Sequence, residues 1–199
     1  MLTLPYHLVL GSQSPRRAEL LKGLDIPFEV RALPNHKEEY PKDLPLEQIP
    51  LYLAKQKATY YINSLKQNEL LITADTVVIV KERVLGKPSN HEEATKMLQM
   101  LSDNCHTVVT GVAFSRPSGI LKAFSSKSQV FFAKLSKDEI NYYLDHYKPY
   151  DKAGSYGIQE WIGYVGIQRI EGSFYNVMGL PIHLVYQTLK SWEDTSNLV

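Results

Sequence analysis

The sequence predicts an α/β fold in which helices flank a mixed, twisted β-sheet. Segments with strand character alternate along the chain with segments that begin at helix-capping residues. The segment 70–80 is almost continuously aliphatic, which is typical of a central buried strand. The segments 105–115 and 120–133 flank a Pro-Ser-Gly turn at 117–119 and predict a long hairpin. Together, strands, hairpins and helices favour a mixed sheet in an α/β domain.

The N-terminal part of the chain predicts a strand, a turn and a helix. The strand covers 7–10 and the turn covers 11–13. Ser14 suits the N-cap of the helix, and Pro15 suits its first position, where a missing N–H costs nothing. The following elements are then expected in order: a strand at 26–31, a polar loop at 34–45 and a helix at 50–64.

Two capping boxes predict the starts of later helices. Asn90 is followed by Glu93, and Ser136 is followed by Glu139, at the spacing that lets each pair cap a helix reciprocally. The C-terminal part predicts these further elements: strands at 163–170 and 173–177 around a Glu-Gly turn, a last helix at 181–192 and a polar tail.

The composition is that of an ordinary globular protein. The chain has 199 residues, 22% charged and 44% hydrophobic, enough for one domain over 1–199 with a sizeable core. The formal net charge of +1 argues against a nucleic-acid partner, because nucleic-acid-binding domains carry a basic excess. No apolar run reaches the length of a membrane span, no signal peptide is evident, and the single Cys105 suits a reducing compartment, so we expect a cytoplasmic protein without a membrane partner. Whether it forms a homodimer is left open.

Two adjacent arginines, Arg16 and Arg17, fall in the first turn of the predicted helix. Cations are unfavourable there, because the helix N-terminus already carries partial positive charge. A bound phosphate would resolve this, since it would accept from the N–H groups and from both guanidinium groups. The alternative is that the arginines are solvated surface residues paired with Glu19 or Glu38.

Asp75 is a single carboxylate within an otherwise apolar strand. Burying a carboxylate is costly unless it is paired, hydrogen-bonded or bound to a metal. Asp75 is therefore a candidate metal ligand or general base, and the alternative is a structural aspartate bonded to backbone N–H groups.

Other polar residues accompany Asp75. Lys87 lies in a Gly-Lys-Pro turn, and Lys57 lies on a helix where Lys55 points about 200° away, so only one of these two can face a site. Glu38 and Glu39 lie in the polar loop. Gln159 ends the glycine-containing segment 151–159, whose backbone can approach a ligand closely. Cations, carboxylates and an amide together indicate a metal-assisted phosphoryl-transfer site.

Six segments resemble, in their order along the chain, the Maf family of nucleotide pyrophosphatases: SQSPRRAELL, LAKQKA, ITADTVV, LGKP, DKAGSYGIQ and VMGLPI. The resemblance extends from Leu8 to Leu189. It implies two lobes around a deep cleft, a fold related to inosine-triphosphate pyrophosphatases, and hydrolysis of a nucleoside triphosphate to the monophosphate and pyrophosphate with Mg²⁺ or Mn²⁺. The segment DKAGSYGIQ is similar to the branch that acts on dTTP and UTP.

The resemblance also implies roles for individual residues. Asp75 matches the proton-accepting aspartate and, with Glu38, the metal site. The remaining matches are Lys57, Lys87 and Arg17 as cationic site residues, and Ser12, Arg16, Thr76 and Gln159 for substrate binding or choice. The sequence departs from the family pattern at Lys37-Glu38-Glu39, where Glu39 is the alternative to Glu38, at Gly11, where alanine is common, and at Glu160, where glycine is frequent.

Substrate choice has a physical rationale. The amide of Gln159 can accept from N3–H and donate to O4 of uracil or thymine, whereas cytosine presents neither group in that pattern. Two alternative functions stay open: a nucleotide-binding regulator of septum formation in cell division, and a pyrophosphatase for another nucleotide such as 7-methyl-GTP. The intact Asp75, Lys57 and Lys87 favour the enzyme over the regulator, because a sensor would not need them.

Overall fold

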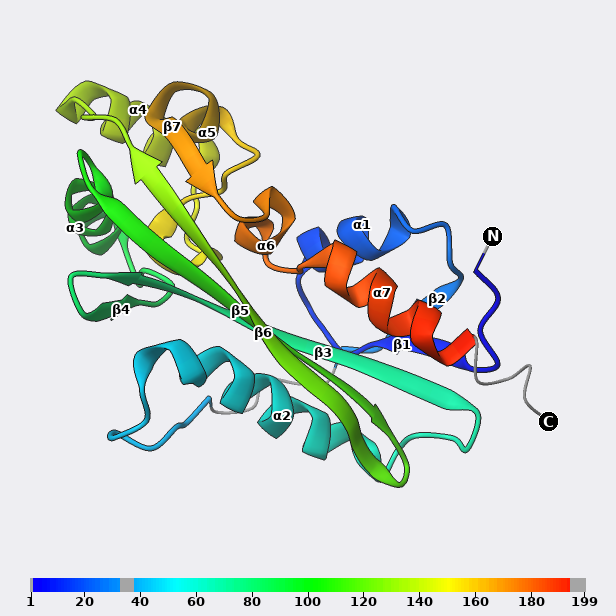
Figure 1. Ribbon diagram of the computed structural model, residues 1–199. Helices are drawn as coiled ribbons and strands as arrows, with labels where there is room; N and C mark the ends of the chain where they lie inside the picture. The colour runs from blue at the N-terminus through cyan, green and yellow to red at the C-terminus, as the bar shows by residue number, and fades with distance from the viewer. Residues whose placement is uncertain (1, 33–37, 194–199) are drawn as a thin grey trace. The chain divides into compact units, whose positions relative to one another are not determined.

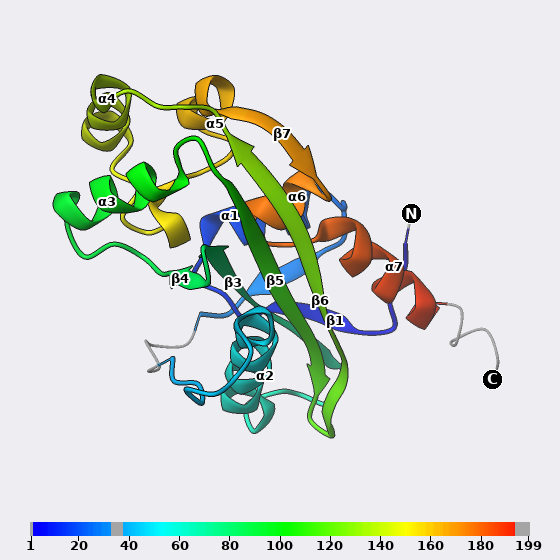
Figure 2. The same cartoon turned by 60° about the vertical axis from the view of Figure 1, so that its left-hand side comes forward.

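The computed structural model describes residues 2–32 and 38–193, and it confirms the mixed α/β architecture (Figures 1 and 2). Within these residues seven strands form one sheet, with β2-β1-β3-β5-β6-β7 in spatial order and β4 paired to β3. The strands are β1 His7–Leu10, β2 Phe28–Val30, β3 Glu69–Val80, β4 Arg83–Leu85, β5 Cys105–Arg116, β6 Gly119–Phe132 and β7 Ile167–Glu171. The α-helices are α1 Pro15–Lys22, α2 Ile49–Ile62, α3 His91–Leu101, α4 Lys137–Tyr147, α5 Trp161–Gly166, α6 Phe174–Met178 and α7 Ile182–Glu193, with short 3₁₀ turns at Leu46–Gln48 and Ala153–Ser155.

The sheet is mixed, as the sequence predicts. β1 pairs in parallel with both β2 and β3, whereas β4 on β3 and β7 on β6 are antiparallel. In the described part of the chain, no helix combines the length and the apolar character needed to span a membrane.

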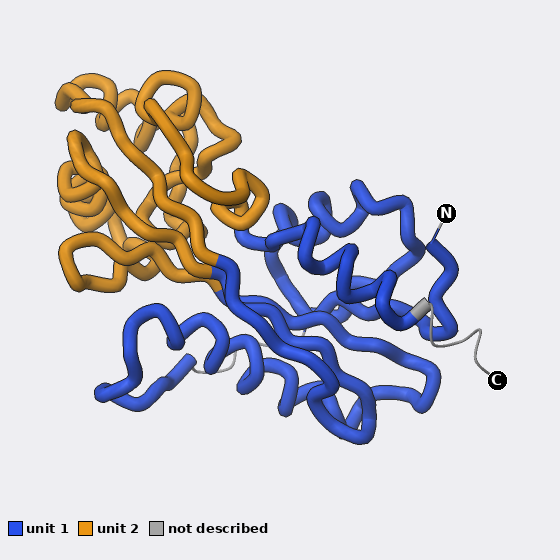
Figure 3. Tube along the Cα trace, in the orientation of Figure 1, with its two compact units in different colours: residues 1–75, 110–126, 179–199 blue, residues 76–109, 127–178 orange. Residues whose placement is uncertain are grey.

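The chain divides into two compact units, shown in blue and orange in Figure 3. Unit 1 comprises residues 1–75, 110–126 and 179–199, and unit 2 comprises residues 76–109 and 127–178. The long strands β3, β5 and β6 contribute residues to both units. Two units agree with the two predicted lobes, while the single domain over 1–199 and the deep cleft stay predictions.

In unit 1, helices cover both faces of the sheet. On one face Thr73 donates its hydroxyl to the carbonyl of Ala54 in α2 at 2.8 Å, and a Cβ at Gly111 would lie only 2.4 Å from the α2 backbone. Phe114 is of opposite parity to Gly111, so it points to the other face, where its ring packs edge-on against Trp192 of α7 at 5.2 Å. Figure 1 shows α2 and α7 on these opposite sides of the blue and green strands.

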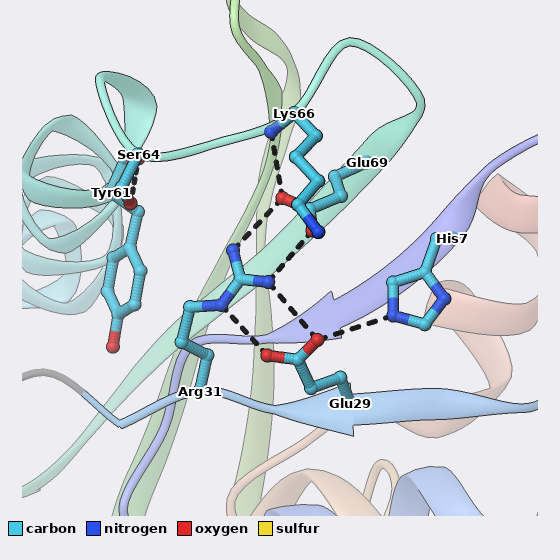
Figure 4. A network of polar contacts seen from close by, with 7 residues as sticks. All are labelled: His7, Glu29, Arg31, Tyr61, Ser64, Lys66 and Glu69. Carbon is cyan, nitrogen blue, oxygen red and sulfur yellow. Dashed lines mark hydrogen bonds and ion pairs between the residues drawn. The ribbon is translucent and has the colours of Figure 1, made fainter.

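An ionic network joins the three parallel strands of unit 1 (Figure 4). The guanidinium of Arg31 donates to both oxygens of Glu69 at 2.8 and 3.0 Å and to both oxygens of Glu29 at 2.9 and 3.1 Å. Glu69 is only 2% exposed and also accepts from the backbone N–H of Lys66 at 2.9 Å. The hydrogen bonds from Arg31 lower the pKa of Glu69 to about 2, so this carboxylate stays charged in the fold.

Both predicted capping pairs begin helices in unit 2. Ser136 and Glu139 form the full capping box of α4, with each side chain bonded to the other residue's backbone N–H. At α3 the side chain of Asn90 accepts from the N–H of Glu93 at 2.9 Å. The carboxylate of Glu93, however, bonds to the N–H and hydroxyl of Ser89 instead of the N–H of Asn90.

The prediction of strands over 163–170 and 173–177 is wrong for most of these residues. Residues 161–166 form α5 and residues 174–178 form α6, and only 167–171 is a strand. The hydroxyl of Ser173 accepts from the N–H of Asn176 at 3.3 Å, a capping bond that begins α6. The β-branched and aromatic residues of these segments have strand character, but packing against the unit 2 core decides their conformation. The strand predicted over 26–31 is shorter, Phe28–Val30.

Candidate functional site

The turn after β1 leads directly into α1. The N–H of Gly11 donates to the carbonyl of Ile72 in β3 at 2.8 Å, so the chain leaves the sheet at this point. Ser12 is 8% exposed, and its hydroxyl accepts from the N–H of Ser14 at 3.1 Å. Ser14 is the N-cap residue, as predicted, but its side chain makes no capping hydrogen bond, which corrects the predicted role. Ser12 therefore shapes the turn that presents the first helical turn of α1.

Arg16 and Arg17 lie in that first turn and are both partly buried. Arg17 donates from Nε to the carbonyl of Gly179 at 2.8 Å, which ties α1 to the segment before α7. Burial lowers the pKa of Arg17, and the nearby charge of Asp75 opposes this shift. Arg17 is therefore not a solvated surface residue, and its charge interacts with that of Asp75, the carboxylate that the sequence singles out.

Asp75 and Glu38 meet at the ammonium group of Lys57. Nζ of Lys57 lies 2.5 Å from Oδ1 of Asp75 and 2.8 Å from Oε1 of Glu38. Asp75 shares a strand face with Thr73, which contacts α2, so the strand alternation directs its carboxylate toward that helix. Lys55 is exposed, so the helix turns only Lys57 toward the carboxylates.

Burial dominates the electrostatics of Asp75. The residue is 7% exposed, and this desolvation raises its pKa, while the charges of Lys57 and Arg17 oppose the rise. Its contact with Lys57 Nζ makes it a paired buried carboxylate, whereas the alternative predicted from the sequence was a structural aspartate bonded to backbone N–H groups. A carboxylate with a raised pKa is a stronger base than one in water, and it faces two cationic side chains.

Glu38 is a loop carboxylate that contacts Lys57. The side chain of Glu38 is 49% exposed, so it reaches Lys57 from the solvent side. Glu39 contacts α2 through its backbone, whose carbonyl accepts from Nε2 of Gln56 at 3.1 Å. Lys37 and the rest of the predicted loop from 34 to 37 lie outside the described residues.

The other predicted site residues belong to unit 2. Thr76 directly follows Asp75 and is partly buried. Lys87 is exposed and follows Gly86, whose carbonyl accepts from the N–H of Gly154 at 3.0 Å, so the two unit 2 loops lie side by side. Oε1 of Gln159 is buried and has no hydrogen-bond partner within residues 2–32 and 38–193. A buried amide oxygen without a donor is costly, which makes this atom a candidate acceptor for a ligand.

Sequence reasoning singled out Glu160 as a departure from the family pattern, but it missed the polar cluster that Glu160 forms with Tyr143 and Lys152 in unit 2. Lys152 is 8% exposed and lies 3.0 Å from Glu160, which also accepts from the hydroxyl of Tyr143. One signal was available, because Tyr143 lies on the same helical face as Ile140 and Leu144. A buried tyrosine hydroxyl in such a stripe needs a partner.

The donor set suits a hard divalent cation only in part. Within the described residues, no group of three or more His, Cys, Asp or Glu side chains is placed to hold a metal ion. Asp75 and Glu38 are two carboxylates that already share one positive charge, the ammonium of Lys57. Mg²⁺ is commonly bound by one or two carboxylates together with substrate phosphates, so this pair fits a cation that arrives with a triphosphate.

Comparison with known proteins identifies the family. A family model described as Maf-like protein matches residues 7–192. The chain is 58% identical over 193 residues to a dTTP/UTP pyrophosphatase of Porphyromonas gingivalis, covering 96% of each chain, and 56% identical over 185 residues to one of Parabacteroides distasonis, covering 93% of this chain and 95% of the relative. A solved nucleoside-triphosphatase (dITP/XTP pyrophosphatase) from Mycobacterium abscessus is similar with a TM-score of 0.43 and 14% identity over 97% of each chain. Because the family model covers all the segments that carry the residues described above, the predicted resemblance is confirmed and the chain belongs to the Maf family.

Proposed function

We propose that the protein hydrolyses dTTP and UTP to the nucleoside monophosphate and pyrophosphate. The relatives at 56–58% identity carry that activity in their names and match nearly the whole chain. The observation in this chain that supports it best is the ion pair between the buried Asp75 and Lys57. The charge of Arg17 also acts on Asp75 and favours its ionised form. This arrangement combines a base with cations that can bind phosphate oxygens.

In the proposed reaction, a water molecule attacks the α-phosphorus and the bond to the β-phosphate oxygen breaks, releasing pyrophosphate. Asp75 accepts the proton of the attacking water, for which its raised pKa is suited. The ammonium of Lys57 keeps the carboxylate in place and ionised before the reaction. Negative charge spreads over the phosphoryl oxygens in the transition state, where fixed cations stabilise it.

Arg16 and Arg17 are proposed to bind the phosphate chain, together with the N–H groups of the first turn of α1. The bond from Nε of Arg17 to Gly179 fixes the plane of its guanidinium, which favours binding at a defined angle. Ser12 and Thr76 are proposed to contribute to substrate binding, and Lys87 to bind a phosphate oxygen. Lys87 is exposed and has no hydrogen-bond or ion-pair partner among the residues described, so binding a phosphate displaces no internal contact.

Asp75 and Glu38 are proposed to hold Mg²⁺ or Mn²⁺. When bound, the cation supplies positive charge that offsets the charge of the triphosphate. The exposed position of Glu38 suits a ligand that enters with the substrate, because its contact with Lys57 can be exchanged without disturbing the core. In this proposal Asp75 is a ligand of the cation and also the group that accepts the proton of the attacking water.

Gln159 is proposed to select the base. Its buried Oε1 has no donor among the residues described, and N3–H of uracil or thymine supplies one. The amide nitrogen donates to O4 of the same base. Cytosine lacks N3–H and presents an amino group at position 4, so with the amide in the same orientation it leaves the buried oxygen unpaired and sets two donors against each other. We therefore expect dTTP and UTP to be hydrolysed well ahead of CTP.

The test is a product assay across nucleoside triphosphates, including 7-methyl-GTP, with Mg²⁺ or Mn²⁺. In ¹⁸O-labelled water, attack at the α-phosphorus puts the label in the monophosphate, whereas attack at the β-phosphorus puts it in pyrophosphate. We expect label in UMP and dTMP. Label in pyrophosphate, faster turnover of 7-methyl-GTP, or binding without hydrolysis would each contradict the proposal.

A variant pair ties the activity to the site. Asp75→Asn removes the base and should lower kcat at least about 10²-fold, the low end for an acid–base group. Asp43→Asn makes the same chemical change at an exposed position of unit 1 and should leave kcat unchanged. Near-normal turnover in Asp75→Asn, with the labelled product unchanged, would remove Asp75 from the mechanism.

A further inference from the structure

A buried network in unit 2 holds the carboxylate of Glu160 from two sides. The hydroxyl of Tyr143, a fully buried residue of α4, donates to Oε2 of Glu160. The ammonium of Lys152 lies 3.0 Å from Oε1 of the same carboxylate and 2.7 Å from Oδ1 of Asp151. The side chains of Lys152 and Glu160 are only 10% and 19% exposed, so both charges are largely removed from water.

The same residues fix the backbone that carries Glu160. Tyr143 accepts from the N–H of Gly157 at 3.0 Å through the oxygen that donates to Glu160. The N–H of Glu160 donates to the carbonyl of Gly157 at 3.0 Å, and its carbonyl accepts from the N–H of Gly163 at 2.8 Å. A Cβ at Gly157 would lie 2.8 Å from the carboxyl carbon of Glu160, so glycine is what lets this side chain fold back over the loop. Backbone and side chain of Glu160 are thus held together.

Gln159 lies between Gly157 and Glu160, the two residues that these contacts hold. The peptide that joins it to Glu160 donates to Gly157, so the backbone direction at Gln159 is set by the network. Its Oε1 is buried without a partner in the described chain. Because no donor in that part of the chain bonds this oxygen, the backbone hydrogen bond next to Gln159 is the contact through which the network can act on this side chain.

A buried ion pair is weak evidence for a contribution to stability. Removing Lys152 and Glu160 from water costs several kcal/mol per ion before their attraction is counted, and well-packed apolar residues are often as stable. Such pairs are better explained where they define a geometry. Here the ion pair helps to fix the position of Glu160, the residue that follows Gln159.

We propose that Glu160 is a positioning residue for substrate choice: Tyr143 and Lys152 hold its carboxylate, and this fixes the amide of Gln159 for pairing with N3–H and O4 of uracil or thymine. The proposal rests on the proposed function for its substrate class. It goes further by assigning to Tyr143, Lys152 and Glu160 the positioning of Gln159, the residue proposed to select the base.

The test compares Tyr143→Phe with Tyr147→Phe. Tyr143→Phe removes one hydroxyl and with it the hydrogen bonds that this hydroxyl makes to the carboxylate of Glu160 and to the N–H of Gly157, while the contact of Lys152 with Glu160 remains. Tyr147 lies on the same helix, is 40% exposed and stacks on the ring of Tyr143 at 5.2 Å, so its substitution is a matched loss of a solvated hydroxyl. We expect the ratio of kcat/KM for UTP over CTP to fall roughly 10-fold in Tyr143→Phe, mainly through a higher KM for UTP, and to stay unchanged in Tyr147→Phe. A purely structural role would lower both substrates equally and leave the ratio intact, which would overturn the proposal.

A second measurement does not depend on activity. In ¹⁵N-labelled protein without substrate, the side-chain amide signals of Gln159 are identified by their loss in Gln159→Leu. We expect them to shift and broaden in Tyr143→Phe and in Glu160→Ala, but less in Glu160→Gln, which keeps an acceptor for Tyr143. Unchanged signals in the first two variants would refute the positioning role. If the wild-type protein hydrolyses no nucleotide, the proposed function fails, and the amide signals alone decide whether Glu160 positions Gln159.

Discussion

Replacing Lys57 by methionine should destabilise unit 1 because it leaves a buried charge unpaired. Methionine has nearly the length of lysine but no charge, so packing against α2 neighbours is retained. The carboxylate of Asp75, 7% exposed, then loses the ammonium that lies 2.5 Å from it. Glu38 is half-exposed and can turn to water, so the cost falls mainly on Asp75.

The size of the effect follows from the burial of the pair. Unit charges about 4 Å apart attract by about 4 kcal/mol at an effective dielectric of about 20. The side chain of Lys57 is 23% exposed, so solvent screens part of this attraction, and Arg17 continues to favour the charged carboxylate. We expect Lys57→Met to lower the free energy of unfolding by roughly 1–3 kcal/mol at pH 7, equivalent to a fall in Tm of roughly 3–10 °C. Because burial raises the folded-state pKa of Asp75, the loss should shrink as the pH falls and the carboxylate takes up a proton.

The two tryptophans allow each unit to be followed separately. Trp192 lies in unit 1 and packs on Phe114, while Trp161 lies in unit 2. In a Trp161→Phe background, thermal unfolding followed by tryptophan fluorescence reports on unit 1. Lys55→Met is the matched control, because Lys55 is an exposed lysine on the same helix.

Combining Lys57→Met with Asp75→Asn tests whether the unpaired carboxylate of Asp75 causes the loss of stability. Asp75→Asn alone should leave stability unchanged or raised, since it removes a desolvated charge. Combined with Lys57→Met it should recover most of the lost stability, because the unpaired carboxylate is gone. If Lys57→Met lies within about 0.5 kcal/mol of the Lys55→Met control, or if the double variant is no more stable than Lys57→Met, the buried pair is not the cause.

Three further predictions concern other charged groups. Replacing Arg16 or Arg17 by lysine keeps the charge but loses the planar fork, so kcat/KM for UTP should fall in steady-state assays, and unchanged kinetics in both variants would mean that neither grips the triphosphate. Burial lowers the pKa of His106 to about 4, so near pH 5 the unfolded chain binds a proton at this residue and the folded protein does not. The free energy of unfolding should therefore fall by up to about 2 kcal/mol from pH 7 to pH 5. In urea unfolding, His106→Gln should reduce this dependence on pH. A lysine at position 31 cannot donate to both oxygens of Glu29 and of Glu69, so Arg31→Lys should lower the free energy of unfolding by about 1–2 kcal/mol. Unfolding is followed by the fluorescence of Trp192, and an unchanged unfolding midpoint would show that the network adds no stability.

Local sequence signals predicted most of the secondary structure correctly. Ser136 with Glu139 and Asn90 with Glu93 marked helix starts because a cap depends on residues within one turn of each other. The aliphatic run that forms β3 was recognised for the same reason, since burial on both faces leaves a continuous apolar pattern. Asp75 was found as the one charge within that run.

Tertiary structure decided the features that join residues far apart in the chain. Helical phase limited the choice to one of Lys55 and Lys57, but the packing of α2 on β3 determined which one meets Asp75. The same holds for the contact between Glu38 and Lys57 and for the helices at 161–166 and 174–178, which have strand-like sequences. Local propensity differs by only about 1 kcal/mol between conformations, so burial of a face against a core outweighs it. Glu160 contacts Tyr143, which lies 17 residues away in the chain, and Lys152, and only the folded chain brings these three side chains together.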